Sequence, residues 1–152
     1  MTENQIASII VDAAYRIHKT LGPGLLESVY EAVLARELAK RGLEVVRQKC
    51  VSINYEDLVI DEGFRADLIV NDLVIIELKS VECGAPVHHK QLLTYLRLTK
   101  KRLGLLLNFG QELMKEGIHR VVNGLPEERW CKRSSAWLQP EPGCSSRLCA
   151  FA

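Results

Sequence analysis

Residues 64–79, Phe-Arg-Ala-Asp-Leu-Ile-Val-Asn-Asp-Leu-Val-Ile-Ile-Glu-Leu-Lys, are the stretch that decides the fold. Two apolar runs of strand length flank the turn-forming pair Asn71-Asp72, a pattern typical of an antiparallel β-hairpin. The second run stays apolar until Glu77 and Lys79, which lie two residues apart and therefore point to the same face. The stretch predicts two adjacent core strands that carry charged side chains at one end.

The charged side chains of this hairpin indicate a metal site. Ionised groups at the end of a buried strand are costly unless they are paired, hydrogen-bonded or bound to a metal. Asp67 on the first strand can lie beside Glu77, and two converging carboxylates repel each other unless a divalent cation lies between them. Such oxygen ligands suit Mg²⁺ or Mn²⁺, which also bind phosphate oxygens.

Lys79 would then lie beside the metal-bound water, where it can orient or help to deprotonate the nucleophile and offset phosphate charge. The alternative is an ordinary Glu-Lys pair on a half-exposed strand edge. The short spacing of Glu77 and Lys79 does not decide between these two interpretations.

Two amphipathic helices are predicted before the strands. Thr2 with Gln5 forms a capping box, and apolar residues at helical spacing then continue to about Lys19. The glycine- and proline-rich residues 21–24 must end this helix. A second helix is predicted from Leu25 to Arg41, and it places Glu27 close to its own apolar face. The residues expected on this face are Leu26, Val29, Tyr30, Val33, Leu34 and Leu38.

The period changes to that of strands after the second helix. A helix from Val87 to Leu98 follows, in which Gln91 and Tyr95 lie four residues apart and share a face with His88, so that all three can lie over the site. The predicted strands are Val45–Ile53, Leu58–Ile60, Phe64–Val70, Leu73–Lys79, Leu103–Phe109 and the short Val121–Val122, with turns at Asn54, Asp61–Gly63 and Asn71-Asp72.

This order of elements predicts a mixed α/β layer fold whose central strands are covered on both sides. Residues 1–123 are expected to form one domain. Residues 124–152 are expected to be an irregular tail, because prolines, cysteines and both tryptophans gather there without usable periodicity. Trp130 and Trp137 in this tail are candidates for a contact with the domain.

Composition limits the classes of protein without identifying one. The 152 residues are 47% hydrophobic and 26% charged, which is typical of a single globular domain. The net charge of +1 gives no support to nucleic-acid binding by bulk electrostatics. The five cysteines form no Cys-x-x-Cys pair, so neither a zinc site nor a disulfide framework is indicated. Without an apolar stretch of membrane-spanning length or a secretion signal, we expect a cytoplasmic protein.

The sequence resembles the GxxExxY proteins, which are grouped with the PD-(D/E)XK nuclease superfamily. The resemblance extends from about Ile6 to Asn123. The naming motif is present as Gly24, Glu27 and Tyr30. The other similar segments are His18–Gly24, Asp61–Asp67, Ile76–Lys79, Ala85–His88 and Gln91–Tyr95.

The resemblance implies a restriction-endonuclease-like core and phosphodiester hydrolysis with Mg²⁺. It implies that Asp67, Glu77 and the backbone carbonyl of Leu78 bind the metal, with Glu27 as a further acid from the helix before the sheet. Lys79 completes the Glu-x-Lys motif. Related exonuclease-like members add a Gln, often with a Tyr one turn later, which Gln91 and Tyr95 match. Ala66 stands where the superfamily has a proline.

Several other polar residues have a structural and a functional interpretation. His18 is expected to satisfy carbonyls at a helix end, and His88 and His89 are expected to be exposed at a helix start. Arg65 either binds phosphate or pairs with Asp67. Tyr30 is expected to pack in the core with its hydroxyl at the edge of the site. The basic run Lys100–Arg102 with Arg97 is the first candidate for contact with a nucleic-acid backbone, although such a run is usually a solvated turn.

We therefore expect a Mg²⁺-dependent nuclease that acts on DNA, with RNA as a second substrate to test. The alternative is a catalytically silent or partner-dependent nucleic-acid-binding or interaction module of the same fold. A hydrolase of small phosphorylated substrates is a third hypothesis. The small size and the near-neutral charge favour self-association or a protein partner.

Overall fold

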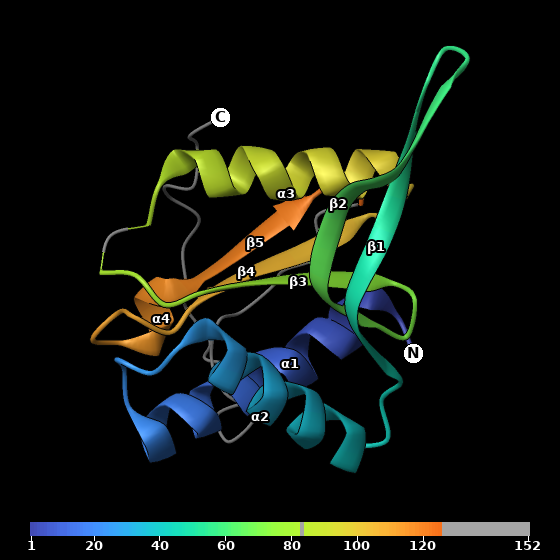
Figure 1. The fold of residues 1–152 in the computed structure, drawn as a ribbon. Coiled ribbons are helices and arrows are strands. Elements are labelled where there is room, and N and C mark those ends of the chain that lie inside the picture. The colour runs from blue at the N-terminus through green and yellow to red at the C-terminus, as the bar shows by residue number, and fades with distance from the viewer. Residues whose placement is uncertain (83, 126–152) are drawn as a thin grey trace, which may run out of the picture.

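A mixed sheet forms the centre of the computed structural model, which describes residues 1–82 and 84–125 (Figure 1). Its five strands lie in the order β1-β2-β3-β4-β5, and neighbours are antiparallel except for the parallel pair β3 and β4. This confirms the predicted mixed α/β fold. The elements in chain order are α1 (Glu3–Leu21), α2 (Glu27–Lys40), β1 (Val45–Tyr55), β2 (Leu58–Val70), β3 (Val74–Lys79), α3 (Pro86–Leu98), β4 (Leu103–Asn108), α4 (Met114–Gly117) and β5 (Ile118–Val122).

Helices cover both faces of the sheet, α1 and α2 on one face and α3 on the other (Figure 1). The alternation of side chains along β3 gives each face its own core, because neighbouring residues of a strand point to opposite sides. Val74 and Ile76 belong to the larger core with α1 and α2, whereas Ile75 packs with Leu92 and Leu96 of α3. Burial on both faces explains why the run before Glu77 is continuously apolar.

The parallel pairing of β3 and β4 brings the carboxyl ends of these strands together, with Lys79 opposite Asn108. Asn108 then holds the segment that follows β3: its side chain accepts the Val81 N–H at 3.0 Å and donates to the Val81 carbonyl at 2.8 Å. Gly110 passes so close to Val81 that a Cβ there would lie 2.5 Å from two of its backbone atoms. The chain beyond Lys79 is therefore fixed in position.

The capping box predicted at the start of the first helix is confirmed, and the helix ends at Leu21, two residues after the predicted Lys19. Thr2 and Gln5 form both hydrogen bonds of the capping box, at 2.9 and 3.3 Å. The following loop uses Gly22 and Gly24 at φ of 72° and 101°, a region that favours glycine. The second helix begins two residues later than predicted, at Glu27 instead of Leu25.

The apolar stripe predicted for the second helix was partly wrong. Leu26 is the N-cap of α2 and its side chain is 74% exposed, and Val29 is also exposed. Both lie on the first turn, which extends past the edge of the core. Tyr30, Leu34 and Leu38 are fully buried as expected.

The prediction of a turn at Asp61–Gly63 was wrong, because these residues lie inside one long strand, β2. Val51 pairs with Phe64 and Ile53 with Ile60, so three residues of β2 lie opposite Ser52 in an irregular bulge. A Cβ at Gly63 would lie 2.2 Å from the side chain of Ile53, so glycine permits this close approach. The turn-forming composition thus bends the strand instead of ending it.

The β1–β2 hairpin projects beyond the body of the molecule, and we call residues 51–64 the arm (Figure 1). Its turn lies between Tyr55 and Leu58, not at Asn54 as predicted. The turn predicted at Asn71-Asp72 is confirmed, with left-handed φ values of 49° and 53°.

The C-terminal part contains one short helix, α4, that the sequence pattern did not predict, and β5 is longer than the predicted Val121–Val122. The boundary predicted after residue 123 stays a prediction, because Trp130, Trp137 and most of the predicted tail lie outside the described residues. In the described ranges 1–82 and 84–125, no helix is both long and apolar enough to cross a membrane.

The contact between Gly110 and Val81 predicts that Gly110→Ala lowers the free energy of unfolding by about 1–3 kcal/mol, because the added methyl group must displace backbone. Urea denaturation measures this change. Gly84→Ala is the control, because a Cβ at Gly84 meets no atom within 4 Å. Equal stability of the two variants would contradict the predicted close contact.

Candidate active site

The site begins where β2 and β3 separate. Pairing between β2 and β3 extends from Val70 and Val74, beside the turn, to Leu68 and Ile76. Asp67 immediately precedes Leu68, the last residue of β2 in this pairing. Its carboxylate accepts the backbone N–H of Leu78 at 2.9 Å. Asp67 therefore joins the two strands through its side chain at the point where backbone pairing ends. Burial raises the pKa of Asp67, although the bond from Leu78 lowers it in part.

Glu77 carries a carboxylate in an environment that disfavours its charge. Only 5% of the residue is exposed, and its Oε2 atom is buried with no hydrogen-bond partner among the described residues. Burial and, next, the nearby charge of Asp67 raise the pKa of Glu77 to about 7, despite the opposing effect of Lys79. A buried carboxylate oxygen without a protein partner, beside a second acid, is a donor arrangement that suits a divalent cation.

Lys79 contacts the groups that the resemblance names as metal ligands. Its ammonium donates to Glu77 at 3.1 Å and to the Leu78 carbonyl at 2.8 Å. Burial by itself lowers the pKa of Lys79, but the carboxylates of Glu77, Glu27 and Asp67 outweigh it, so the pKa is raised. Lys79 therefore remains a cation that neutralises part of this acidic site.

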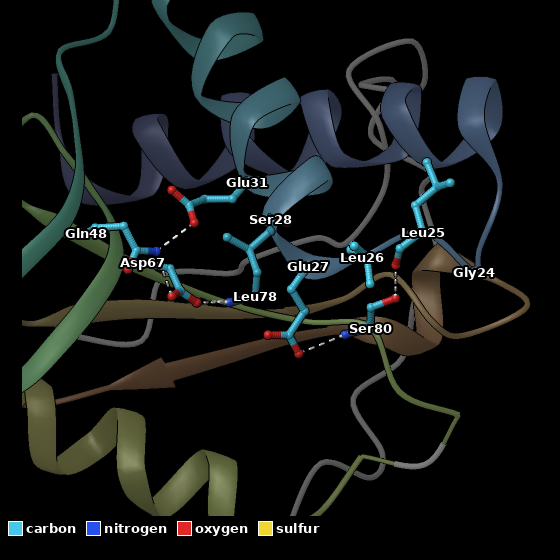
Figure 2. A pocket seen from close by; sticks show the side chains of 10 residues that line it. All are labelled: Gly24, Leu25, Leu26, Glu27, Ser28, Glu31, Gln48, Asp67, Leu78 and Ser80. Carbon is cyan, nitrogen blue, oxygen red and sulfur yellow. Dashed lines mark hydrogen bonds between the residues drawn. The ribbon is translucent and has the colours of Figure 1, made fainter.

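Glu27 approaches the site from the first turn of α2. Its carboxylate accepts the backbone N–H of Ser80 at 3.3 Å, just beyond the end of β3 (Figure 2). The Ser80 hydroxyl donates in turn to the Leu25 carbonyl at 2.6 Å. These contacts join the start of α2 to the end of β3. The charge of Glu27 also raises the pKa of Glu77.

Tyr30 explains how the Gly-x-x-Glu-x-x-Tyr motif shapes this region. Its ring is buried and stacks on Phe109 with ring centroids 4.3 Å apart, as expected for core packing. Its hydroxyl donates to the Gly22 carbonyl at 2.6 Å and accepts the Leu25 N–H at 3.2 Å. The tyrosine therefore fixes the glycine loop that precedes Glu27.

A cavity of about 650 Å³ opens between α2 and the ends of β2 and β3. Figure 2 shows the carboxylates of Glu27 and Asp67 on either side of Leu78 in this cavity. The residues that line it are Gly24, Leu25, Leu26, Glu27, Ser28, Glu31, Gln48, Asp67, Leu78 and Ser80.

Two of these lining residues, Glu31 and Gln48, were not predicted. The Gln48 amide donates to Glu31 at 2.6 Å and to Asp67 at 3.3 Å, so it joins α2 to the candidate site. Gln48 has a φ of 49°, which is uncommon for a residue other than glycine. The only sequence signal for Glu31 was its position four residues after Glu27, which places both acids on one face of α2.

Gln91 and Tyr95, the residues predicted on α3, lie on the opposite side of β3 from the cavity at α2. The Gln91 amide donates to the Tyr95 hydroxyl at 2.5 Å, and the Tyr95 ring stacks on Phe64. Burial raises the pKa of Tyr95, and the Glu77 carboxylate adds to this effect, so the phenol lies within electrostatic reach of the site.

A second cavity of about 520 Å³ lies beside Lys79 on the α3 side of the sheet. His88 and His89 line it and are half-buried, whereas we expected both to be exposed. They share it with Lys79 at the end of β3 and Asn108 at the end of β4. Lys90, Glu116 and His119 also line this cavity, so it holds both basic and acidic side chains.

Other candidate residues have structural contacts instead. The Arg65 guanidinium lies 3.8 Å from Glu62 and not at Asp67. A His18 ring nitrogen hydrogen-bonds the Gln111 carbonyl at 2.9 Å, which fits its expected structural role.

The basic run at 100–102 lies far from the candidate site, at the other end of β3. It precedes Leu103, which pairs with Val74 at the opposite end of β3 from Lys79. Lys101 forms an ion pair with Asp72 at 2.8 Å, and Arg102 forms one with Glu3 at 2.6 Å. Contact of this run and Arg97 with a nucleic-acid backbone stays a prediction, and it would lie the length of β3 away from Lys79.

The donor set at the site fits a divalent cation bound mainly by oxygen. Asp67 and Glu77 supply carboxylates and Leu78 supplies a carbonyl, and the unpartnered Glu77 Oε2 is available as a ligand. Within residues 1–82 and 84–125, no three His, Cys, Asp or Glu side chains form a group that could hold a metal ion. Direct ligation by Glu27 therefore stays a prediction, and its carboxylate contacts the Ser80 N–H.

Comparison with known proteins supports the superfamily expected from the motifs. A family model described as the PD-(D/E)XK nuclease superfamily matches residues 4–121, a range that contains all the candidate site residues. Searches of curated proteins and of solved structures found no match. The narrower resemblance to the GxxExxY proteins stays a prediction.

The raised pKa of Glu77 predicts a pH-dependent effect of Glu77→Gln in the metal-free protein. Because the pKa in the folded state is about 7, above the ordinary value of 4.5, the folded protein retains a proton that the unfolded chain has released. Glu77 therefore costs stability as the pH rises from 4.5 through 7. With a chelator present, we expect Glu77→Gln to be more stable than the unmodified protein by about 1–3 kcal/mol at alkaline pH.

Urea denaturation at acidic and at alkaline pH measures this difference, which should vanish on the acidic side. Glu44→Gln, at an exposed position, is the matched control and should show no such pH dependence. A Glu77→Gln protein that is less stable than the unmodified chain at alkaline pH would show that the carboxylate is not strained by its surroundings.

Proposed function

We propose that this chain, which belongs to the PD-(D/E)XK nuclease superfamily, hydrolyses phosphodiester bonds in DNA with a divalent cation as cofactor. The observation that carries this proposal is the convergence of Asp67, Glu77 and Lys79 where β2 and β3 separate. Glu77 holds a buried oxygen without a partner there, and Lys79 contacts both Glu77 and the Leu78 carbonyl.

Asp67, Glu77 and the Leu78 carbonyl would hold the cation, with Glu27 as a further acid near it. Mg²⁺ or Mn²⁺ bound there would activate water for attack on the phosphodiester and offset charge on the phosphate. Glu77 would gain most from this partner, because burial and the charge of Asp67 both make its own charge costly.

Lys79 provides a proton donor beside the reacting group. Its ammonium contacts Glu77 and the Leu78 carbonyl, so it lies beside the groups that would hold the cation. With three N–H groups, it can keep its contact with Glu77 and also donate to a phosphate oxygen when a cation takes the Leu78 carbonyl. It thereby stabilises negative charge that develops during hydrolysis.

The surrounding residues position the substrate and the acids. Gln91 and Tyr95 present an amide and a phenol over the α3 side of the site, where they can bind a phosphate or a sugar oxygen. Gln48, anchored by Glu31, holds the side chain of Asp67 from the α2 side. Lys90 of the second cavity can give an anionic polymer a further contact beside Lys79.

Cleavage assays test the proposal directly. We expect the unmodified protein to cut DNA in Mg²⁺ or Mn²⁺ and not in EDTA, and Lys79→Ala to lower the rate by roughly 10²–10⁴-fold. Lys40→Ala, on the exposed last turn of α2, is the control and should cut normally. Single-stranded DNA, double-stranded DNA and RNA are compared in parallel, so that cutting of RNA alone would correct the substrate.

Metal binding separates an active nuclease from a silent module of the same fold. Calorimetric titration with Mn²⁺ should give one site, weakened at least tenfold by Asp67→Asn and unchanged by Glu44→Gln. Metal binding without cleavage of any of the three polymers would favour the binding module. Absence of metal binding would exclude the proposed chemistry.

A further inference from the structure

The arm carries apolar side chains that belong to neither core of the sheet. Beyond the bulge, Ile53 pairs with Ile60 and Tyr55 pairs with Leu58. Residues paired directly across two strands share a face, and so do residues two apart along a strand, so these four side chains lie on one face of the arm. Tyr55 is 66% exposed, Leu58 55% and Ile60 43%.

This apolar face lies on a protruding edge of the sheet. β1 is the terminal strand of the sheet, and the arm extends away from the helices that cover the two cores (Figure 1). Apolar side chains gathered on such an edge promote association with another chain, and natural proteins usually avoid them where no contact is formed. The surface therefore indicates a contact with a partner.

Charge is distributed unevenly along the same hairpin. Residues 50–64 contain the four acids Glu56, Asp57, Asp61 and Glu62 and no lysine or arginine. Lys49 and Arg65 lie at the base of the arm, and their nearest carboxylates are 3.8 Å away, at Asp72 and Glu62. Glu56 and Asp57 therefore make the tip of the arm acidic, whereas Asp61 and Glu62 lie in the bulge, next to the basic side chains at the base.

We propose that the arm is a homodimer contact, in which two arms pack antiparallel with their apolar faces together about a two-fold axis near Ile53. Glu56 lies three residues beyond Ile53 and Lys49 four residues before it, or about 10 and 14 Å at the rise of an extended strand. A two-fold axis near Ile53 therefore brings the acidic tip of each arm to the basic base of the other.

Self-complementary charge favours a second copy of this chain over other occupants. The acidic tip would repel the phosphates of a nucleic acid, so the arm does not suit a backbone contact. An unrelated protein would need an independent match to both the apolar and the charged parts. The dimer contact would also lie close to the candidate site, because Gln48 at the base of the arm donates to Asp67.

Sedimentation equilibrium of the full chain over a range of micromolar concentrations tests this proposal. We expect a monomer–dimer equilibrium that shifts strongly to monomer in the double variant Tyr55→Ser with Leu58→Ser. Val59→Ser is the matched control, because Val59 is 61% exposed but lies on the opposite face of the same hairpin. Circular dichroism checks that all variants remain folded.

Charge reversal tests the antiparallel arrangement. Lys49→Glu should raise the dimer dissociation constant roughly tenfold, because the substitution removes both symmetry-related contacts between Lys49 and Glu56. Adding Glu56→Lys to this variant should restore the dimer, since the reversed charges meet again across the axis.

A monomer at every concentration would overturn the proposal and would assign the apolar face to a different protein. A dimer that the Tyr55 and Leu58 substitutions leave intact, or that Val59→Ser weakens equally, would also overturn it. These results do not depend on cleavage, so the dimer and the nuclease proposals can fail separately.

Discussion

The burial of Glu77 at the end of an apolar strand is the constraint on which the candidate site depends. The residue is 5% exposed, and burial together with the nearby charge of Asp67 raises the pKa of Glu77, so its charged form is costly. Lys79 offsets part of this charge, and Asp67 is held by the Leu78 N–H. A folded protein that retains two strained carboxylates in one place sacrifices stability there, as functional sites commonly do.

The fold keeps this end of the sheet open while it fixes the chain on each side. α2 is joined to Ser80 through Glu27 and Leu25, and β4 is joined to Val81 through Asn108. One cavity therefore opens toward α2 and another toward α3, with the end of β3 between them. Glu27, Glu31 and Asp67 line the cavity on the α2 side, whereas Lys79 and Lys90 line the cavity on the α3 side together with Glu116. The two lysines would offer an anionic polymer a contact close to the acids of the first cavity.

Local sequence patterns predicted the parts of the structure that depend on local chemistry. The capping box of α1, the turn at Asn71-Asp72 and the shared face of Glu77 and Lys79 all follow from spacing alone. The mixed sheet followed from the order of elements. Asp61–Gly63 was predicted as a turn and forms a bulge, because glycine and acidic residues are common in both structures. Only the pairing with β1 distinguishes a bulge from a turn here. Gln48 could not be found, because its position depends on a left-handed backbone and on a contact with distant Asp67.

The metal position proposed between the two carboxylates is tested most directly by anomalous diffraction from crystals grown with Mn²⁺. We predict one anomalous peak within ligating distance of Asp67, Glu77 and the Leu78 carbonyl, with the Lys79 ammonium displaced from the Leu78 oxygen that it now contacts. A peak elsewhere, or none while Lys79 remains bonded to Glu77 and Leu78, would contradict the proposed cation site and would favour an ion pair with a structural role.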